Sequence, residues 1–201
     1  VQHEYNYANK IRGGIVMNPL ATSKEDILAA SRELIMENGW TALSIRAVAS
    51  KCSVSAGTIY NYYESKADLL GATIESVWHE IFFHPEDEQV FCDVTSCIVW
   101  IYERLEQGNQ QFPGFFSFHS LGFMRDEKEN GKKLMMQTWK HILHGLCEVL
   151  KHDAKIRPDA FDEQFTEEQF ADILFSLILV AVIRQDYNPS SVLMLVDKTI
   201  Y

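Results

Sequence analysis

The sequence lacks the short motifs by which many enzymes are recognised, and it has no long apolar segment. Among its 201 residues there is no GxSxG, HExxH, P-loop or dinucleotide-binding pattern, so nothing in it indicates catalysis or a bound cofactor. The longest apolar run, Ile173 to Ile183, spans 11 residues and contains Ser176, whereas a membrane-spanning helix needs roughly 20. We therefore expect a soluble protein that is not an enzyme.

Cysteine is scarce, and its spacing does not fit the usual metal or disulfide frameworks. The four cysteines include no CxxC pair and no secretory signal opens the chain, so we expect reduced thiols in the cytoplasm. Cys92 and Cys97 are five residues apart and do not share a helical face well, which favours a buried structural role over a redox switch. His141 and His144 have helical spacing but no third ligand, so we expect no metal site.

The sequence also lacks the excess of positive charge that is typical of proteins that bind nucleic acid. Its formal net charge is −10, but the charges are unevenly distributed. Residues 17–66 carry five basic and five acidic groups, whereas residues 67–201 carry 11 basic and 22 acidic groups. The first third therefore differs electrostatically from an acidic remainder, and we expect the two parts to have separate functions.

Helical periodicity is present throughout, and no alternating strand pattern reaches a useful length. We therefore predict an all-α fold of about nine helices. Capping residues, glycines and prolines predict where the helices begin and end. The predicted boundaries are Thr22–Ser23, Asn38–Gly39, Ser44, Cys52–Ser53, Ser55, Tyr63, Ser65, His84–Pro85, Gln107–Asn109, a polar connection over 152–165, Thr166 and Asn188–Pro189.

The stretch between residues 52 and 70 combines small hydroxyl residues, a glycine and three tyrosines, and it follows two short predicted helices. Three short helices braced by a fourth are typical of a helix-turn-helix domain, whose second motif helix lies in the major groove of DNA. The residues at the start of that helix should have small side chains that can form hydrogen bonds, as Ser55–Thr58 do. The side chain of Thr58 is suited to contact the edge of a base. The residues expected to reach the sugar–phosphate backbone are Tyr60, Tyr62 and Lys66.

Residues 22–70 resemble the N-terminal signature of the TetR family of one-component transcriptional regulators. The segments that match in order and spacing are Gly39–Ser44, Val48–Ala49, Val54–Ser55, Gly57–Tyr60, Tyr62–Tyr63 and Lys66–Leu69. The resemblance implies that Ser44 contacts phosphate at the start of the second helix and that Arg46 reaches a base or a phosphate. The residues that it implies for the recognition helix and its exit are Ser55, Ala56, Gly57, Thr58, Tyr60, Asn61, Tyr62 and Lys66.

The chain departs from the family pattern at three positions. It has Ser53 in the turn where glycine is usual, and Cys52 where alanine is usual. A non-glycine residue in the left-handed region costs roughly 1 kcal/mol, which the motif can tolerate. Tyr63 replaces the usual phenylalanine and is expected to pack inside. These changes leave every expected DNA-facing group in place.

The resemblance also implies an effector cavity between helices 4 and 7, a region where this sequence is rich in aromatic residues. Ligand sites are largely apolar and aromatic with a few polar groups, although core packing accounts for most of these rings. The helix that begins after Ser65 should couple the two sites, because Lys66 stands at its DNA end and Trp78 and Phe82 at its cavity end. The expected lining residues, with His119 as a polar anchor, are Trp78, Phe82, Trp100, Phe116, His119, Phe123, Trp139 and Leu143.

The helix that contains residues 173–183 is apolar around nearly its whole circumference, so it must be covered on all sides. Its own chain can cover one face, and a second subunit is the natural cover for the other; a buried core helix of a monomer is the alternative. Two helices from each subunit would form a four-helix bundle. The residues expected at this interface are Leu174, Leu177, Ile178, Ala181, Val192, Leu195 and Val196.

These observations predict a ligand-responsive transcriptional regulator that binds a palindromic operator on double-stranded DNA as a homodimer. We expect a repressor that a small, largely apolar or aromatic effector releases. Residues 1–21 are expected to be a leader or flexible arm, in which residues 1–16 are either vector-derived or native. Residues 22–66 form the predicted DNA-binding domain, and residues 67–201 the ligand-binding and dimerisation domain. The alternative is an all-α sensor or enzyme that has lost operator binding.

Overall fold

The computed structural model of the chain describes residues 22–82, 91–116 and 130–201, with the backbone alone over 130–138. Every regular element in these ranges is helical, which confirms the predicted all-α class. The expected arm over 1–21, the break at His84–Pro85, and both His119 and Phe123 lie outside the described residues. The elements are α1 (Lys24–Asn38), η1 (Trp40–Ala42), α2 (Ile45–Lys51), α3 (Ala56–Tyr60), α4 (Lys66–Phe82), α5 (Val94–Gln111), α7 (Asn130–His152), α8 (Glu167–Arg184) and α9 (Ser190–Thr199).

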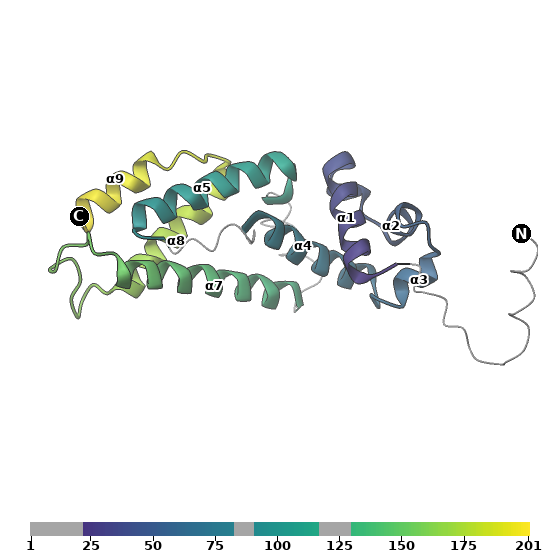
Figure 1. Cartoon of the computed structure of the whole chain (residues 1–201), viewed down its shortest axis with the longest axis horizontal. Helices are drawn as coiled ribbons and strands as arrows, with labels where there is room; N and C mark the ends of the chain where they lie inside the picture. The colour runs from purple at the N-terminus through teal and green to yellow at the C-terminus, as the bar shows by residue number, and fades with distance from the viewer. Residues whose placement is uncertain (1–21, 83–90, 117–129) are drawn as a thin grey trace, which may run out of the picture.

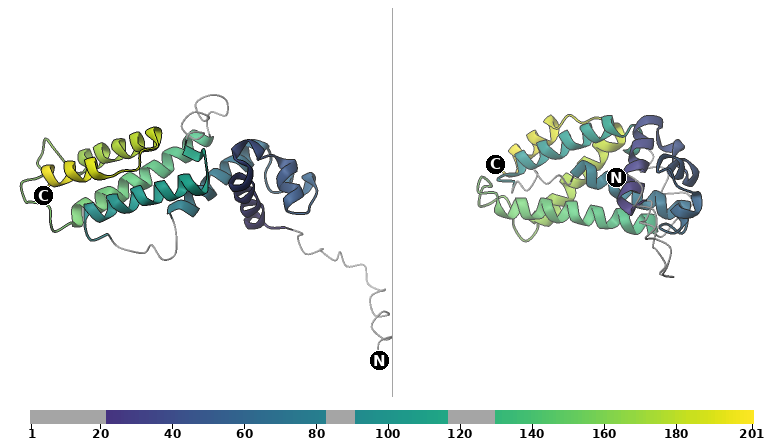
Figure 2. Two further views of the ribbon diagram at one scale, coloured as in Figure 1. Left: turned by 90° about the horizontal axis from the view of Figure 1, so that it is seen from above. Right: turned by 45° about the vertical axis from the view of Figure 1, so that its right-hand side comes forward.

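The helices are arranged in an elongated molecule (Figure 1). The helices α1, α2 and α3 gather at one end, and α4 leads from this group into a bundle of α5, α7, α8 and α9. In that bundle α7 packs along α8, and α5 packs against α4, α7 and α9 (Figure 2). The C-terminal residue lies at the opposite end of the molecule from α3 (Figure 1).

Capping side chains begin the helices close to where the sequence predicts them. Ser23, not Thr22, caps α1, because its Oγ accepts a hydrogen bond from Asp26 N at 3.0 Å while Asp26 Oδ2 accepts one from Ser23 N at 2.9 Å. Thr166 and Gln169 form the predicted capping box of α8. Gly39 ends α1 at a φ of 75°, in the left-handed region where glycine is favoured.

The predicted helix end at Gln107–Asn109 is wrong, since α5 continues to Gln111. Gly108 is buried inside the helix, and a Cβ placed there would lie 2.7 Å from Ile81 Cδ1 of α4. The glycine therefore permits a close approach between α5 and α4 instead of stopping the helix. A single glycine inside a helix costs only about 1 kcal/mol relative to alanine, which tertiary packing can offset.

A polar cluster holds the far end of the bundle together. Asp153 is 6% exposed, and its Oδ2 accepts hydrogen bonds from Val94 N at 2.9 Å and from the Tyr201 hydroxyl at 2.5 Å. Asp93 caps α5, and its Oδ2 pairs with Lys155 Nζ at 2.5 Å. These bonds tie the start of α5 to the loop after α7 and to the last residue of the chain.

The Lys155 ammonium and the Ser96 amide lower the pKa of Asp93 from 3.8 to about 2. A carboxyl group whose pKa is lower in the folded state stabilises the fold above its unfolded pKa and loses that contribution as the pH falls through its folded pKa. We therefore expect the free energy of unfolding to fall between pH 4 and pH 2 more steeply in the wild type than in Asp93→Asn, which keeps a helix-capping side chain. Urea titrations at several pH values would measure this, and parallel curves for the two proteins would contradict it.

Candidate nucleic-acid interface

The turn between α2 and α3 is held by backbone hydrogen bonds. Cys52 N donates to Val48 O, and Val54 N donates to Ala49 O, both at 2.9 Å. Ser53 lies between them with a φ of 56°, in the left-handed region. The sequence predicted a left-handed backbone conformation at this position, because glycine is usual there in the family that the sequence resembles. The turn therefore fixes how α2 and α3 lie against each other.

Replacing Ser53 with glycine should stabilise the protein. Glycine adopts a positive φ without steric cost, although its greater freedom in the unfolded chain offsets part of the gain. We expect Ser53→Gly to raise the free energy of unfolding by about 0.5 kcal/mol, as measured by urea denaturation. Ser50→Gly, inside the neighbouring helix α2, is the matched control and should destabilise the protein. A lower stability for Ser53→Gly would show that the serine side chain makes a compensating contact.

The short helix α3 is anchored by one buried residue and leaves polar groups accessible around it. Ile59 is fully buried, whereas Tyr60 is 52% exposed and Gly57 and Asn61 are also exposed. Ser55 caps the helix, since its Oγ accepts a hydrogen bond from Thr58 N at 3.1 Å and lies 3.0 Å from Thr58 Oγ1. The two hydroxyl groups therefore orient each other, and Ala56 beside them is half-buried. This arrangement is the one expected of a helix whose start approaches base edges.

The charged residues of this region divide into paired and unpaired groups. Lys51 is paired with Glu33 and Glu37 at 3.1 and 2.9 Å, and Arg32 is paired with Glu80 at 3.6 Å. Arg46 and Lys66 are exposed and make no ion pair with the residues that the structure describes, so their charges are available for phosphate groups. Ser44 caps α2 through a hydrogen bond from Ala47 N at 3.2 Å, and its side chain is half-buried.

Two tyrosines that follow α3 have structural contacts. Tyr63 is 7% exposed, so the predicted inward packing is confirmed. The hydroxyl of Tyr62 donates a hydrogen bond to the Thr22 carbonyl oxygen at 2.6 Å. Tyr62 therefore ties the exit of α3 to the segment just before α1. Its contact with the DNA backbone stays a prediction, and a hydrogen bond from its hydroxyl to a phosphate would require giving up the bond to Thr22.

The residues predicted to line an effector cavity pack against one another and against their neighbours. Trp78 stacks on Phe82 with ring centroids 5.5 Å apart and contacts Phe116 at 5.7 Å, while Phe82 contacts Trp100 at 5.8 Å. Trp139 instead contacts Phe175 of α8, and Leu143 is half-buried on α7. The structure thus joins four of the predicted rings in one cluster, and among the described rings Trp139 makes no contact with that cluster.

Most of the predicted interface residues on α8 and α9 face the core of their own chain. Leu174, Ile178, Ala181, Val192 and Val196 are at most 7% exposed, so they cannot form a surface for a second subunit and that part of the prediction is wrong. Leu177 is half-buried and Leu195 is 37% exposed. The apolar side chains that α8 and α9 leave accessible, here called the α8–α9 face, are Ile173, Val180, Ile183, Met194 and Leu195.

Two features of the aromatic region were not predicted from the sequence. Trp40, in the turn after α1, stacks on Phe115 with ring centroids 5.2 Å apart, and Trp78 contacts the same Phe115 ring at 5.3 Å. Tyr187 contacts Phe116 at 6.4 Å, and its hydroxyl oxygen is buried without a hydrogen-bond partner among the described residues. No sequence signal connects these residues, because they come from segments far apart along the chain. The contact of Trp40 with Phe115 joins η1 to the aromatic cluster.

Within the described ranges, no group of histidine, cysteine and carboxylate side chains has the geometry of a metal site. None of the described helices combines the length and apolar character of a membrane span.

Comparison with known proteins relates the N-terminal third to bacterial regulators. Residues 27–73 match the family described as bacterial regulatory proteins, tetR family. The HTH-type transcriptional regulator UidR of Escherichia coli K12 is 42% identical over 48 residues, which are 24% of this chain and 24% of UidR. The chain therefore spans about a quarter of the length of this curated relative. The matched family and UidR are transcriptional regulators and not enzymes.

Solved structures of regulators share the fold over most of the chain. A tetR-type regulator from Streptomyces avermitilis has a TM-score of 0.60 at 16% identity, covering 92% of this chain and 100% of that one. The regulator FadR of Bacillus subtilis, solved in complex with stearoyl-CoA, has a TM-score of 0.57 at 18% identity, covering 89% and 100%. At such identities the likeness is one of fold. It extends the similarity from the N-terminal helices to the larger helical bundle.

Proposed function

We propose that this chain is a member of the TetR family of bacterial regulatory proteins and acts as a repressor that binds a palindromic operator as a homodimer and is released by a small effector. The observation that carries the proposal is the α2–turn–α3 unit, in which Ser53 adopts a φ of 56° and accessible polar residues surround the buried Ile59. In this proposal residues 22–66 bind DNA, and residues 67–201 bind the effector and the second subunit. Such a protein acts where the DNA is, in the cytoplasm.

The proposed dimer uses the α8–α9 face. Ile183 is 68% exposed and Met194 is 64% exposed, and the helical spacing of Ile173, Val180 and Ile183 places these three on one side of α8. Covering such a surface is favourable by roughly 25 cal/mol for each Å² removed from water. A two-fold axis would place the two copies of α3 in successive major grooves, which is why the operator should be palindromic.

The proposed effector site lies at the aromatic cluster around Trp78 and Phe116. FadR was solved with stearoyl-CoA, a ligand with a long apolar chain, and the rings of this cluster suit an apolar or aromatic molecule. The cluster reaches the DNA-facing helices through α4 and through the contact between Trp40 and Phe115. An effector that binds the DNA-incompetent arrangement more tightly would release the operator. Equal affinity for free and DNA-bound protein would contradict this coupling.

A gel-shift assay with the intergenic DNA upstream of the protein's own gene tests the proposal. We expect a specific complex at low salt that weakens as salt is added, because each phosphate that Arg46 or Lys66 neutralises releases counterions. Failure to bind any such fragment, even at low salt, would favour the alternative of a helical sensor that has lost operator binding.

Thr58 and Lys66 should contribute to DNA binding in different ways. Thr58→Ala should weaken binding by about 1–3 kcal/mol at one base position and relax discrimination there. Lys66→Ala should weaken all sequences alike and reduce the slope of log K against log salt by about 0.9 for each phosphate that the lysine neutralises. Binding isotherms for an operator and its single-base variants at several salt concentrations would separate the two. Identical salt slopes for the wild type and Lys66→Ala would show that Lys66 does not neutralise a phosphate of the operator.

A further inference from the structure

A hollow of about 580 Å³, open to solvent, lies beside the first turns of α8 and is here called the α8 hollow. Its wall is partly apolar and partly acidic, and the residues that line it are Gln164, Phe165, Glu168, Gln169, Asp172 and Ile173. Glu168 is paired with Lys151 of α7 at 3.5 Å. Asp172 is exposed and makes no ion pair within the described ranges. The hollow therefore offers an apolar wall and an unpaired carboxylate.

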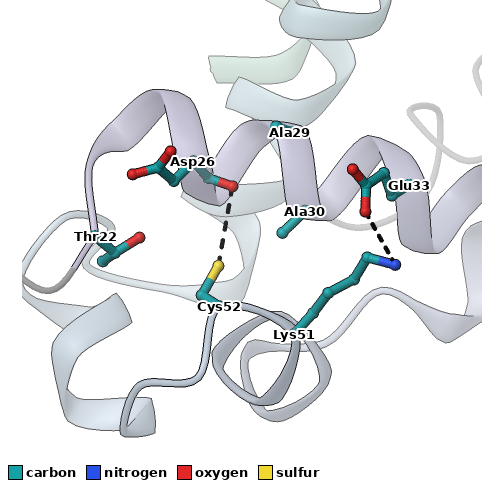
Figure 3. A pocket seen from close by; sticks show the side chains of 7 residues that line it. All are labelled: Thr22, Asp26, Ala29, Ala30, Glu33, Lys51 and Cys52. Carbon is teal, nitrogen blue, oxygen red and sulfur yellow. Dashed lines mark hydrogen bonds and ion pairs between the residues drawn. The ribbon is translucent and has the colours of Figure 1, made fainter.

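Another hollow, of about 300 Å³, lies between α1 and the end of α2, and its polar groups contact one another. Figure 3 shows Lys51 of this hollow paired with Glu33, at 3.1 Å. The Cys52 sulfur lies next to Thr22 and 3.9 Å from the carbonyl oxygen of Asp26. The contacts of this hollow are therefore made within the chain, whereas the α8 hollow leaves a carboxylate facing solvent.

The accessible side chains of α8 follow a regular spacing. Intervals of four, three, four and three residues separate Gln169, Ile173, Ser176, Val180 and Ile183, which are all exposed. This alternation places them in one stripe along the helix, which is the pattern of a helix that packs lengthwise against another helix. Ser176, in the middle of the stripe, has a small side chain that lets a second helix approach closely. The stripe includes the part of the α8–α9 face that α8 contributes.

The stripe is complementary to itself when two α8 helices lie antiparallel. If Ile173 lies opposite Ile183 of a second copy, a step of three residues along both helices brings Ser176 opposite Val180 of that copy. A small side chain therefore meets a large one near the middle of the contact, and two large apolar side chains meet on either side of it. Two-fold symmetry forms each of these contacts twice.

The same register brings together two charges that cannot pair within one chain. It sets Asp172 at the level of Arg184 of the second copy. Arg184 is exposed and makes no ion pair with any residue that the structure describes. In one α8 helix the two residues are 12 positions apart, which separates them by about 18 Å along the axis. Helix-dipole effects are confined to the terminal turns, and Asp172 lies beyond the first turn, so the dipole does not account for its charge.

We propose that the α8 hollow is the docking site for the end of α8 of a second copy of this chain. Ile183 of that copy packs against Phe165 and Ile173, and its Arg184 pairs with Asp172. Ile183 is 68% exposed in the single chain, so covering it removes a large apolar surface from water. This docking rests on the proposed dimer, to which it adds the antiparallel register and the side chains that fill each hollow.

Charge reversal tests the pairing of Asp172 with Arg184. Asp172→Arg and Arg184→Asp each place like charges together at both symmetric positions, so each should raise the dissociation constant of the dimer at least about tenfold. Asp172→Arg/Arg184→Asp restores opposite charges and should return the constant to within about threefold of the wild type. Glu103→Arg, the same charge change at an exposed position of α5, should leave it unchanged. Sedimentation equilibrium at low salt would measure all five proteins.

Cysteine cross-linking tests the register itself. The background variant Cys52→Ser/Cys92→Ser/Cys147→Ser removes the cysteines that are not buried. In it, a mixture of Ile173→Cys and Ile183→Cys should form a covalent dimer on oxidation. Each variant alone should not, because in this register like positions are about 15 Å apart along the helix axes, beyond the Cα separation of about 7 Å that a disulfide can span.

Three results would overturn the docking while the wild type remains a dimer. They are single charge reversals that leave the dissociation constant unchanged, a double variant that dissociates as readily as the single ones, and covalent dimers that form as fast from each cysteine variant alone as from the mixture. The reversed and cross-linked positions are all exposed, and circular dichroism would check that each variant is folded. A wild type that is monomeric at micromolar concentration would instead contradict the proposed dimer, and the docking with it.

Discussion

Replacing Val180 with glutamate is expected to give a folded monomer that has lost operator binding. Val180 is 40% exposed in the middle of the α8–α9 face, so the charge is solvated in the monomer and becomes buried and unpaired only in the dimer. A dimer holds two linked recognition helices, and removing this linkage lowers affinity on the order of 100-fold or more. Light scattering would report the molecular mass, and operator binding would be measured on the same samples.

The controls for Val180→Glu separate dissociation of the dimer from unfolding. Ile178→Glu places the charge at a site only 4% exposed, in the core of the chain, and should unfold the protein. Gln107→Glu adds the same charge at an exposed position on α5 and should change neither mass nor binding. If the wild type were monomeric at micromolar concentration, the proposed dimer would be contradicted, and so would the expectation of a palindromic operator.

Replacing Asp153 with alanine is expected to destabilise the protein by about 3 kcal/mol. The carboxylate is 6% exposed, and its two oxygens accept hydrogen bonds from Val94 N, Lys155 N and the Tyr201 hydroxyl. Its removal leaves the Val94 amide, at the start of α5, without its acceptor in a buried position. Urea denaturation would measure the change.

Tyr201→Phe is the matched control, because it removes a single hydrogen bond of the same cluster and should cost about 1 kcal/mol. Asp159→Ala changes a carboxylate whose side chain is 87% exposed, and it should change stability by less than about 0.5 kcal/mol. An effect of Asp153→Ala no larger than that of Tyr201→Phe would show that water replaces the missing carboxylate.

The helices could be predicted because their signals are local in the chain. Capping side chains reach only three residues along the chain, as Ser55 does to Thr58 and Thr166 to Gln169. The helix-turn-helix motif is a local pattern of the same kind, so the position of Ser53 in a left-handed turn was also predictable. The helix end at Gly108 was mispredicted because a glycine can either end a helix or allow another helix to pack closely against it. Only the position of Ile81 in the folded chain distinguishes these two roles.

The sequence by itself determined that the chain is helical, that it carries a helix-turn-helix pattern near its start, and that α8 is apolar around nearly its whole circumference. The tertiary structure decided which side of α8 is covered, because periodicity marks an apolar helix but does not say which neighbour fills which face. It buried Leu174, Ile178 and Ala181 against their own chain and left Val180 and Ile183 accessible. It also placed Trp40 on Phe115, and Thr22 beside Cys52. Such contacts join residues far apart in sequence, so the packing of the whole fold is what brings them together.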